Sequence, residues 1–324
     1  MNYKLSALYS GAGIIVTYKC TAACLHCAYS SSPRRDGAYI SRGMADRIFA
    51  LLSRAGCRSV HIGGGEPFVS FGGLLEACAS AREHGVAIDY IETNGSWFTD
   101  DAGVSQKLRE LRGAGVDCLL VSVDPFHNEF VPYAKVKGLL KCCERNNFGT
   151  FVWQSKFERV VRRMDENTAH TLGEYKEKYG AGFVQDIADA YGLGYNGRAL
   201  RILAGGPRHG AEHFLGDRCA SNIRSVQHYH VDLNGDFIPP GCIGFKADIF
   251  ELCGEGLDEE KYANFLAVAN GGLGGLYERA CALGFKPEPG GYASKCGLCF
   301  DIKKYLLEKH APYDIGPAGF FEES

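Results

Sequence analysis

The feature that most constrains the fold is an alternation of apolar, strand-like runs with amphipathic segments. The strand candidates lie at 14–18, 58–63, 86–92, 117–123, 149–154 and about 198–203. The segments between them have helical spacing, as in Arg42–Ala55 and Tyr133–Arg145. This order predicts an α/β fold in which helices cover a parallel sheet. Six repeats predict a partial (β/α)6 barrel, with functional residues at the C-terminal ends of the strands.

The alternation stops after residue 203. Residues 204–216 are Gly-rich and are typical of a linker. An apparent hairpin follows in the stretch HYHVDLNGDFIPPGC, with Asn234-Gly235 as its turn, and helical stretches lie at about 258–283 and 301–309. We therefore predict two domains, a barrel over residues 1–210 and a small α+β domain over residues 211–324.

Charge and hydropathy exclude several classes of protein. The net charge is −3 and no long run carries one sign, so the chain lacks an electrostatic footprint for nucleic acid. No apolar run approaches the roughly 20 residues of a membrane span. The N-terminal stretch MNYKLSALYSGAG lacks the apolar region of a signal peptide. The sequence predicts a cytoplasmic protein with neither a nucleic-acid partner nor a membrane partner.

The chain has 14 cysteines, and their number requires an explanation. Disulfides are disfavoured in a reducing cytosol, whereas thiolates are good ligands for zinc and iron–sulfur clusters. Cys57, Cys78 and Cys118 have apolar or helical surroundings, which favours small buried hydrophobic residues. Cys253 and Cys281 are either structural or serve as a ligand or hydrogen donor. Two further sets, one near each end of the chain, have the setting of metal ligands.

The first set lies in KCTAACLHCA, where Cys20, Cys24 and Cys27 have the spacing C-x3-C-x2-C. A zinc site with His26 as fourth ligand, a disulfide, and an iron–sulfur cluster one ligand short all fit this spacing. Three thiolates can hold three irons of a 4Fe–4S cluster and leave the fourth iron open for a small molecule.

Later strand ends carry further polar and glycine-rich segments. GGGEP (63–67) ends the second strand candidate, IETNG (91–95) the third and LLVSVD (119–124) the fourth. The glycines permit close backbone approach, and Glu66 can accept a hydrogen bond from a ligand ammonium. His127 and Glu129 follow in the fourth loop, where either a solvent-facing role or a ligand contact fits. Shared placement at one edge of the sheet favours a common site.

These residues together resemble the radical SAM superfamily. The three N-terminal cysteines match its cluster motif, and Gly64 to Pro67 match its GGEP motif, which meets the methionyl ammonium of S-adenosylmethionine. Ser122 and Asp124 resemble the family's polar pair near the ribose, and Gly197-Arg198-Ala199 resembles its segment near the adenine. The resemblance implies that Cys20, Cys24 and Cys27 bind a catalytic 4Fe–4S cluster. It implies these cofactor contacts: Gly64, Gly65, Glu66, Pro67, Asn94, Ser122, Asp124 and Arg198.

The resemblance also implies the chemistry. The open iron binds S-adenosylmethionine, one electron breaks its carbon–sulfur bond, and a 5′-deoxyadenosyl radical abstracts a substrate hydrogen. The cofactors supply this chemistry, and the protein orients them. A reducing partner such as flavodoxin or ferredoxin is expected to provide the electron.

A second set comprises Cys219, Cys242, Cys296 and Cys299. Four thiolates complete either a closed 4Fe–4S cluster or a zinc site. Their order resembles the twitch domain, a shortened SPASM-like domain found after radical SAM barrels. That resemblance implies an auxiliary 4Fe–4S cluster.

Three functional hypotheses stay open. The chain resembles short radical SAM enzymes that modify ribosomally made peptides by crosslinking, oxidation or epimerisation. PPGCIG has one cysteine where an epimerase hydrogen donor would lie in an adjacent pair, which argues against epimerisation. The second hypothesis is a dehydrogenase for a small metabolite, favoured by the lack of room for a peptide-recognition domain before residue 14. The third is a non-catalytic iron–sulfur or zinc scaffold.

Overall fold

The computed structural model describes residues 3–9, 11–217 and 219–322. The chain divides into two compact units. The sheet unit comprises Ser10–Cys24 and Ser31–Leu193, and the C-terminal unit comprises Met1–Tyr9, Leu25–Ser30 and Gly194–Ser324. The predicted domain boundary at residues 210 and 211 stays a prediction.

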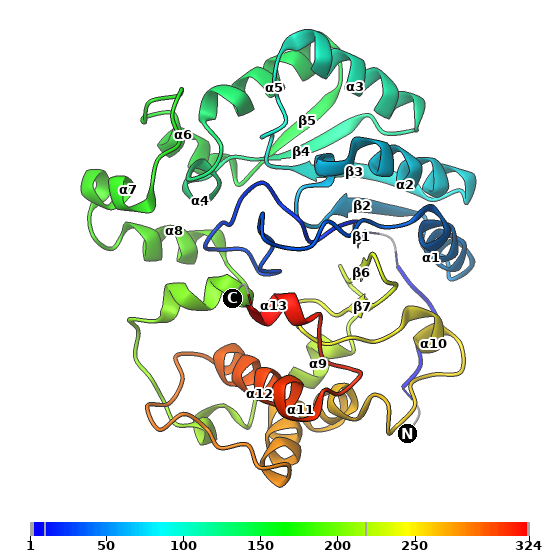
Figure 1. Ribbon diagram of the computed structural model, residues 1–324, viewed down its shortest axis with the longest axis vertical. Helices are drawn as coiled ribbons and strands as arrows, with labels where there is room; N and C mark the ends of the chain where they lie inside the picture. The colour runs from blue at the N-terminus through cyan, green and yellow to red at the C-terminus, as the bar shows by residue number, and fades with distance from the viewer. Residues whose placement is uncertain (1–2, 10, 218, 323–324) are drawn as a thin grey trace. The chain divides into compact units, whose positions relative to one another are not determined.

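The sheet unit is built on five parallel strands in the order β5-β4-β3-β2-β1 (Figure 1). Their bounds are Ala12–Ile15 for β1, Ser59–Gly63 for β2, Ala87–Thr93 for β3, Cys118–Ser122 for β4 and Gly149–Trp153 for β5. Register brings Ile14 beside Ile62 and Leu119 beside Ile91, and all four side chains are fully buried. The predicted mixed α/β fold with a parallel sheet is confirmed.

Four helices of similar length lie side by side along one face of this sheet (Figure 1). They are α1 (Arg42–Arg54), α2 (Phe71–Glu83), α3 (Asp101–Gly113) and α5 (Tyr133–Arg145). Local sequence sets their starts, because Ser41 caps α1 by accepting from Met44 N and Asp100 caps α3 by accepting from Gly103 N. Apolar residues such as Phe49 and Leu108 face the sheet and are fully buried.

Shorter helical pieces follow the ends of β2, β4 and β5. They are η1 (Pro67–Ser70), α4 (Pro125–Asn128), η2 (Ser155–Phe157), α6 (Glu158–Val161), α7 (Leu172–Tyr179) and α8 (Phe183–Tyr191). A capping box between Thr171 and Glu174 starts α7. These short helices form part of the loops at the carboxyl edge of the sheet.

Two strand predictions need correction. The expected sixth strand, at about 198–203, is the 3₁₀ helix η3 (Gly197–Leu203). Gly197 has φ +54, and a Cβ there would lie 2.7 Å from the Ala28 carbonyl and 3.0 Å from that of Cys27. This close approach of two backbones turns the chain where an extended strand was expected. The first strand ends at Ile15 instead of residue 18, because Thr17 bridges antiparallel to Tyr39.

The C-terminal unit contains the predicted hairpin. β6 (His230–Asp232) pairs antiparallel with β7 (Phe237–Ile238), and Gly235 takes φ +84 in the turn. Asp232 Oδ1 accepts from the N–H groups of Asn234 and Asp236, which fixes the turn.

Helices make up most of the rest of this unit. They are η4 (Ala211–Phe214), α9 (Cys219–Ile223), α10 (Ile249–Cys253), α11 (Ala263–Ala282), α12 (Lys295–His310) and α13 (Ala318–Glu322). A break at Gly272, where φ is +64, interrupts α11. The last predicted helix begins six residues early, at Lys295 instead of residue 301, because Ser294 caps it by accepting from Gly297 N.

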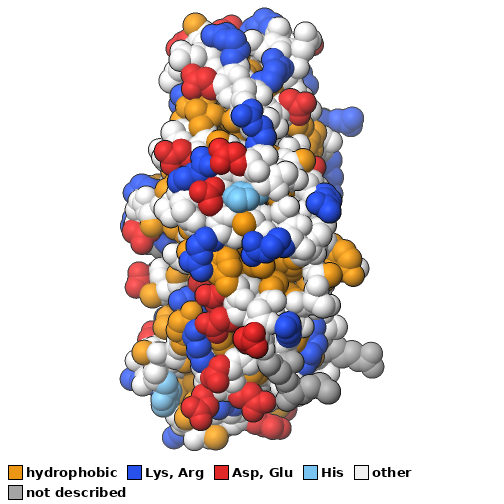
Figure 2. Space-filling model, turned by 90° about the vertical axis from the view of Figure 1, so that its right-hand side faces the viewer, with side chains coloured by type: hydrophobic (Ala, Val, Ile, Leu, Met, Phe, Trp, Pro, Cys, Tyr) orange, Lys and Arg blue, Asp and Glu red, His pale blue; other side chains and the backbone are white. Residues whose placement is uncertain are grey.

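The surface agrees with the expectation of mixed charge. Figure 2 shows acidic and basic side chains interspersed over the face that it displays, without a field of one sign. None of the helices within residues 3–9, 11–217 and 219–322 is both long enough and apolar enough to cross a membrane.

Candidate active site and metal centres

The first cysteine set lies on the long loop that follows β1. Backbone contacts fix the start of this loop, since Cys20 N donates to Ser32 O at 3.1 Å. Lys19 Nζ donates to the carbonyls of Pro33 and Arg35, both at 3.2 Å. The Cys20 sulfur accepts from Ala22 N at 3.4 Å. Cys20 and Cys24 belong to the sheet unit, and Cys27 follows Cys24 by three residues.

The GGGEP segment packs directly against this loop. Gly65 N donates to Thr17 O at 2.8 Å, and Glu66 N donates to Lys19 O at 2.9 Å. A Cβ on Gly64 would lie 2.5 Å from Thr17 O, and one on Gly65 would lie 2.0 Å from Lys19 O. Both distances are below any permitted contact. The two glycines are therefore required for the backbone of the cysteine loop to lie where it does.

Glu66 links two of the predicted segments. Its carboxylate is buried and accepts from Thr93 Oγ1 and Asn94 N, both at 2.8 Å, and from Phe68 N at 3.2 Å. Burial raises the pKa of Glu66 to about 7, although the three donors oppose that shift. The side chain thus engages the IETNG segment, whereas a ligand ammonium was its expected partner. Pro67 accepts through its carbonyl from Tyr39 Oη at 3.0 Å.

Asn94 completes the connection to the cysteines. Its Nδ2 donates to Thr21 Oγ1 at 3.0 Å and lies 3.6 Å from the Cys20 sulfur. Thr21 and Ser96 share a hydroxyl hydrogen bond of 2.7 Å. A continuous chain of polar contacts therefore runs from Cys20 through Asn94 to Glu66. These three predicted residues come together in one place.

The two polar residues predicted at the end of β4, Ser122 and Asp124, differ in exposure. Asp124 is buried and caps α4, accepting from His127 N at 2.9 Å and from His127 Nδ1 at 2.7 Å. Ser122, the last residue of β4, is partly exposed. Burial lowers the His127 pKa, but the negative charge and hydrogen bond of Asp124 outweigh it, so the pKa is raised overall.

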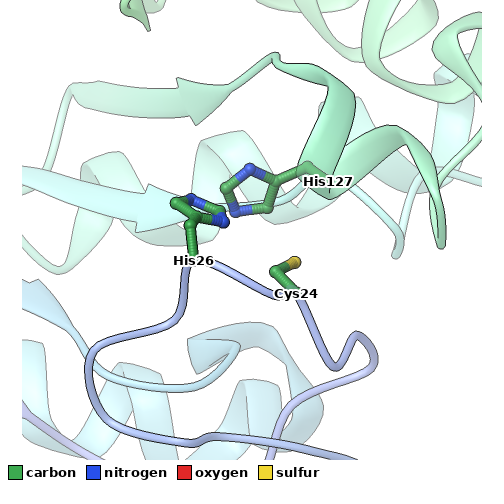
Figure 3. A group of neighbouring side chains, drawn as sticks. All are labelled: Cys24, His26 and His127. Atoms are coloured by element: carbon green, nitrogen blue, oxygen red, sulfur yellow. The ribbon is translucent and has the colours of Figure 1, made fainter. Parts of the chain in front are cut away.

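His127 is oriented toward the cysteine loop. A ring nitrogen of His127 and the sulfur of Cys24 lie within 4.8 Å of each other (Figure 3). His26, which Figure 3 also shows, follows Cys24 by two residues. Glu129 has a different partner, because its carboxylate accepts a hydrogen bond from Leu172 N at 3.0 Å. The fourth loop thus supplies His127, held by Asp124, to the neighbourhood of the cysteines.

Two residues at the carboxyl edge of the sheet, Thr93 and Glu92, were not predicted from the sequence. Thr93 donates to Glu66 and accepts from Gly95 N and Trp97 Nε1, so it is a central connector. Glu92 has a pKa that burial raises to about 7, and its Oε1 lies 3.7 Å from His61 Nε2. Glu92 and Thr93 both lie within IETNG, and strand alternation would have placed their side chains on opposite faces.

The second cysteine set converges within the C-terminal unit. Cys219 begins α9, Cys242 follows the hairpin, and Cys296 and Cys299 lie in the first turns of α12. Burial and the neighbouring Cys299 raise the pKa of Cys242 to about 12 and that of Cys296 to about 11. Each of these thiols therefore lies within electrostatic range of other members of the set.

The donor set suits a thiolate-bound metal centre. Mutually repelling thiolates are stabilised when a metal supplies positive charge among them. Lys295 lies beside the set, and its Nζ contacts Asp217 Oδ1 at 2.7 Å. Both a 4Fe–4S cluster and zinc fit four cysteines.

Arg198 and the two spare cysteines lie in the C-terminal unit. Arg198 is buried in η3, directly after Gly197, which packs against the carbonyl of Cys27. Cys253 ends α10, and burial raises its pKa to about 11, while Cys281 is exposed on α11.

The N-terminal part of the chain is similar to known proteins. Residues 14–151 match the domain that defines the Radical SAM superfamily. The family uses a 4Fe–4S cluster and S-adenosylmethionine. A curated relative, the putative peptide biosynthesis protein YydG of Bacillus subtilis (strain 168), is 24% identical over 123 residues. That match covers 38% of each protein, so the chain spans well under half of the relative's length.

Solved structures give weaker similarity. The structure of native anSMEcpe with bound AdoMet and the Cp18Cys peptide is 17% identical, with a TM-score of 0.36, over 48% of this chain and 46% of that one. Streptococcus suis SuiB bound to the precursor peptide SuiA is 15% identical, with a TM-score of 0.38, over 91% of this chain and 76% of that one.

Proposed function

We propose that the chain is a radical SAM enzyme that modifies a ribosomally made peptide. In this proposal Cys20, Cys24 and Cys27 would hold a 4Fe–4S cluster, which together with S-adenosylmethionine and one electron would supply the radical chemistry that removes a substrate hydrogen. The observation that carries the proposal is the polar chain from Cys20 through Asn94 to Glu66, which ties three predicted motifs into one site.

The chain's own residues have defined tasks in this proposal. Gly64 and Gly65 admit the cysteine loop against the sheet edge, and Asn94 directs an N–H toward Cys20. Hydrogen-bond donors to ligand sulfurs are among the factors that set a cluster's potential. Asp124 holds the ring of His127 toward Cys24. Ser122, Pro67 and Arg198 are proposed as the remaining contacts with S-adenosylmethionine.

The C-terminal unit is proposed to hold an auxiliary 4Fe–4S cluster on Cys219, Cys242, Cys296 and Cys299. Its support is the convergence of four thiols from three separate segments of the unit. We also propose a flavodoxin or ferredoxin as the electron donor, and the cytoplasm as the compartment, where thiols stay reduced.

The peptide substrate class rests on the similarity to the curated relative, a putative peptide biosynthesis protein. Crosslinking or another oxidation is the favoured outcome, since the hairpin ends in the single cysteine of PPGCIG. A small metabolite as substrate is an alternative outcome of the test below.

Anaerobic reconstitution tests the proposal. Protein supplied with iron and sulfide, then reduced with S-adenosylmethionine, is expected to form 5′-deoxyadenosine. Co-expression with short peptides encoded beside its gene should give a peptide whose mass has fallen by the hydrogens removed. Absence of 5′-deoxyadenosine from fully loaded protein, with or without peptides, would overturn the enzyme assignment. Its formation with a modified metabolite and unmodified peptides would overturn the substrate class.

A further inference from the structure

Lys303 is a buried ammonium in the C-terminal unit. Its side chain is 3% exposed, and its Nζ donates to the carbonyl of Ile243. The same Nζ lies 4.9 Å from the ring centre of Phe245 and 5.8 Å from that of Phe320. Within residues 3–9, 11–217 and 219–322, no carboxylate forms a salt bridge with it. A lysine this deeply buried is almost always paired with a negative charge.

The four-cysteine set lies next to this ammonium. Ile243, whose carbonyl Lys303 contacts, directly follows Cys242. On α12, Lys303 lies four residues after Cys299 and seven after Cys296, which puts the three side chains on one face of the helix. Negative charge on this set is therefore the counter-charge that the lysine otherwise lacks.

We propose that Lys303 is the buried counter-charge of the C-terminal cluster and raises its reduction potential. The inference rests on the auxiliary cluster of the proposed function. Reduction adds a negative charge to the cluster, so a fixed cation stabilises the reduced state more than the oxidised state. Because the ammonium is buried, salt screens its effect only weakly. Gly244 leaves room for the Lys303 ammonium, since a Cβ at residue 244 would lie 3.0 Å from the Nζ of Lys303.

A redox titration of the auxiliary cluster tests the proposal. The titration is followed by electron paramagnetic resonance in a Cys20→Ala background, which removes the signal of the N-terminal cluster. Lys303→Met is expected to lower the ratio of reduced to oxidised cluster about tenfold at a fixed potential, which equals 59 mV for one electron. Lys304→Met is the matched control, because Lys304 is the next residue along but is exposed. Lys303→Arg keeps the charge and should restore the parent ratio.

The outcomes separate this inference from the proposed function. Equal midpoints for Lys303→Met and Lys304→Met would overturn the tuning role while leaving the cluster in place. Loss of the auxiliary cluster from both Lys303→Met and a second variant, Lys303→Gln, would make the lysine a structural requirement and would also overturn tuning. Zinc, or no second cluster at all, in protein with native Lys303 would overturn both the auxiliary cluster and the inference.

Discussion

The two cysteine sets are held in different ways. Cys20, Cys24 and Cys27 come from one short loop, and backbone contacts and two obligatory glycines hold the start of that loop, residues 17–20, against the ends of parallel strands. The second set draws four thiols from three segments of the C-terminal unit and lies beside the ammonium of Lys303.

The two arrangements suit two different tasks. A loop with three thiols at a sheet edge leaves one cluster position for a ligand, and neighbouring strand ends can contact that ligand. Four thiols close the coordination shell, so the remaining control over a cluster is its electrostatic surroundings. We interpret the first set as a reaction site and the second as a redox centre.

Cys20→Ala should have the largest effect and would separate the two sets most sharply. Loss of one of three ligands is expected to reduce 5′-deoxyadenosine formation to background and to lower iron from about eight to about four atoms per chain. Iron analysis and chromatography of the anaerobic reaction measure both. Cys281→Ala, at an exposed position, is the control and should change neither. Continued cleavage in Cys20→Ala would sink the assignment of the first cluster.

Cys242→Ala is expected to separate the loss of iron from the loss of activity. It should also lower iron to about four atoms per chain, but 5′-deoxyadenosine should still form, because the N-terminal ligands stay intact. Chromatography and iron analysis on the same preparation decide the matter. If cleavage is lost while the N-terminal cluster is still present, the two sets do not have the separate tasks that we assign to them.

Gly65→Ala tests whether backbone packing holds the open site. A Cβ there would lie 2.0 Å from Lys19 O, so the cysteine loop must shift. Overpacking of this kind costs about 1–3 kcal/mol and should also weaken iron retention at the first site. Urea unfolding and iron analysis measure the two effects. Gly72→Ala is the control, because a Cβ at Gly72 meets nothing within 4 Å. Equal behaviour of the two variants would contradict the packing argument.

Thr93→Val should have the smallest effect of the four. It removes one donor to Glu66 and the acceptor for Gly95 N and Trp97 Nε1, at a cost of roughly 1–3 kcal/mol in unfolding free energy. Thr150→Val on β5 is the control and should stay within about 0.5 kcal/mol. Urea unfolding measures both variants. A neutral Thr93→Val would show that the Glu66 network does not stabilise the site.

Helix bounds, the hairpin turn and the motifs at strand ends could be predicted from the sequence, because each depends on residues close together in the chain. The helix expected over Tyr133–Arg145 has those bounds in the structure, and the hairpin turn lies at Asn234-Gly235 as expected. The motifs GGGEP and IETNG were also readable, because each ends a strand. Their shared position at the edge of a parallel sheet then followed from topology.

What sequence could not give depends on contacts between distant segments. A strand was expected at 198–203, but Gly197 packs against the carbonyls of Cys27 and Ala28, which requires a turn. Lys303 was overlooked because the last helix was expected to begin at residue 301, after both of its cysteines. Only a helix that begins at Lys295 puts Cys296, Cys299 and Lys303 on one face.

The most direct test of the central claim is electron paramagnetic resonance of the reduced protein with and without S-adenosylmethionine, in two variants. In Cys242→Ala, only the N-terminal cluster is present, and we predict that S-adenosylmethionine changes its spectrum. In Cys20→Ala, only the auxiliary cluster is present, and we predict an unchanged spectrum. A response of the auxiliary cluster, or none from the N-terminal cluster, would contradict the division of labour between the two cysteine sets.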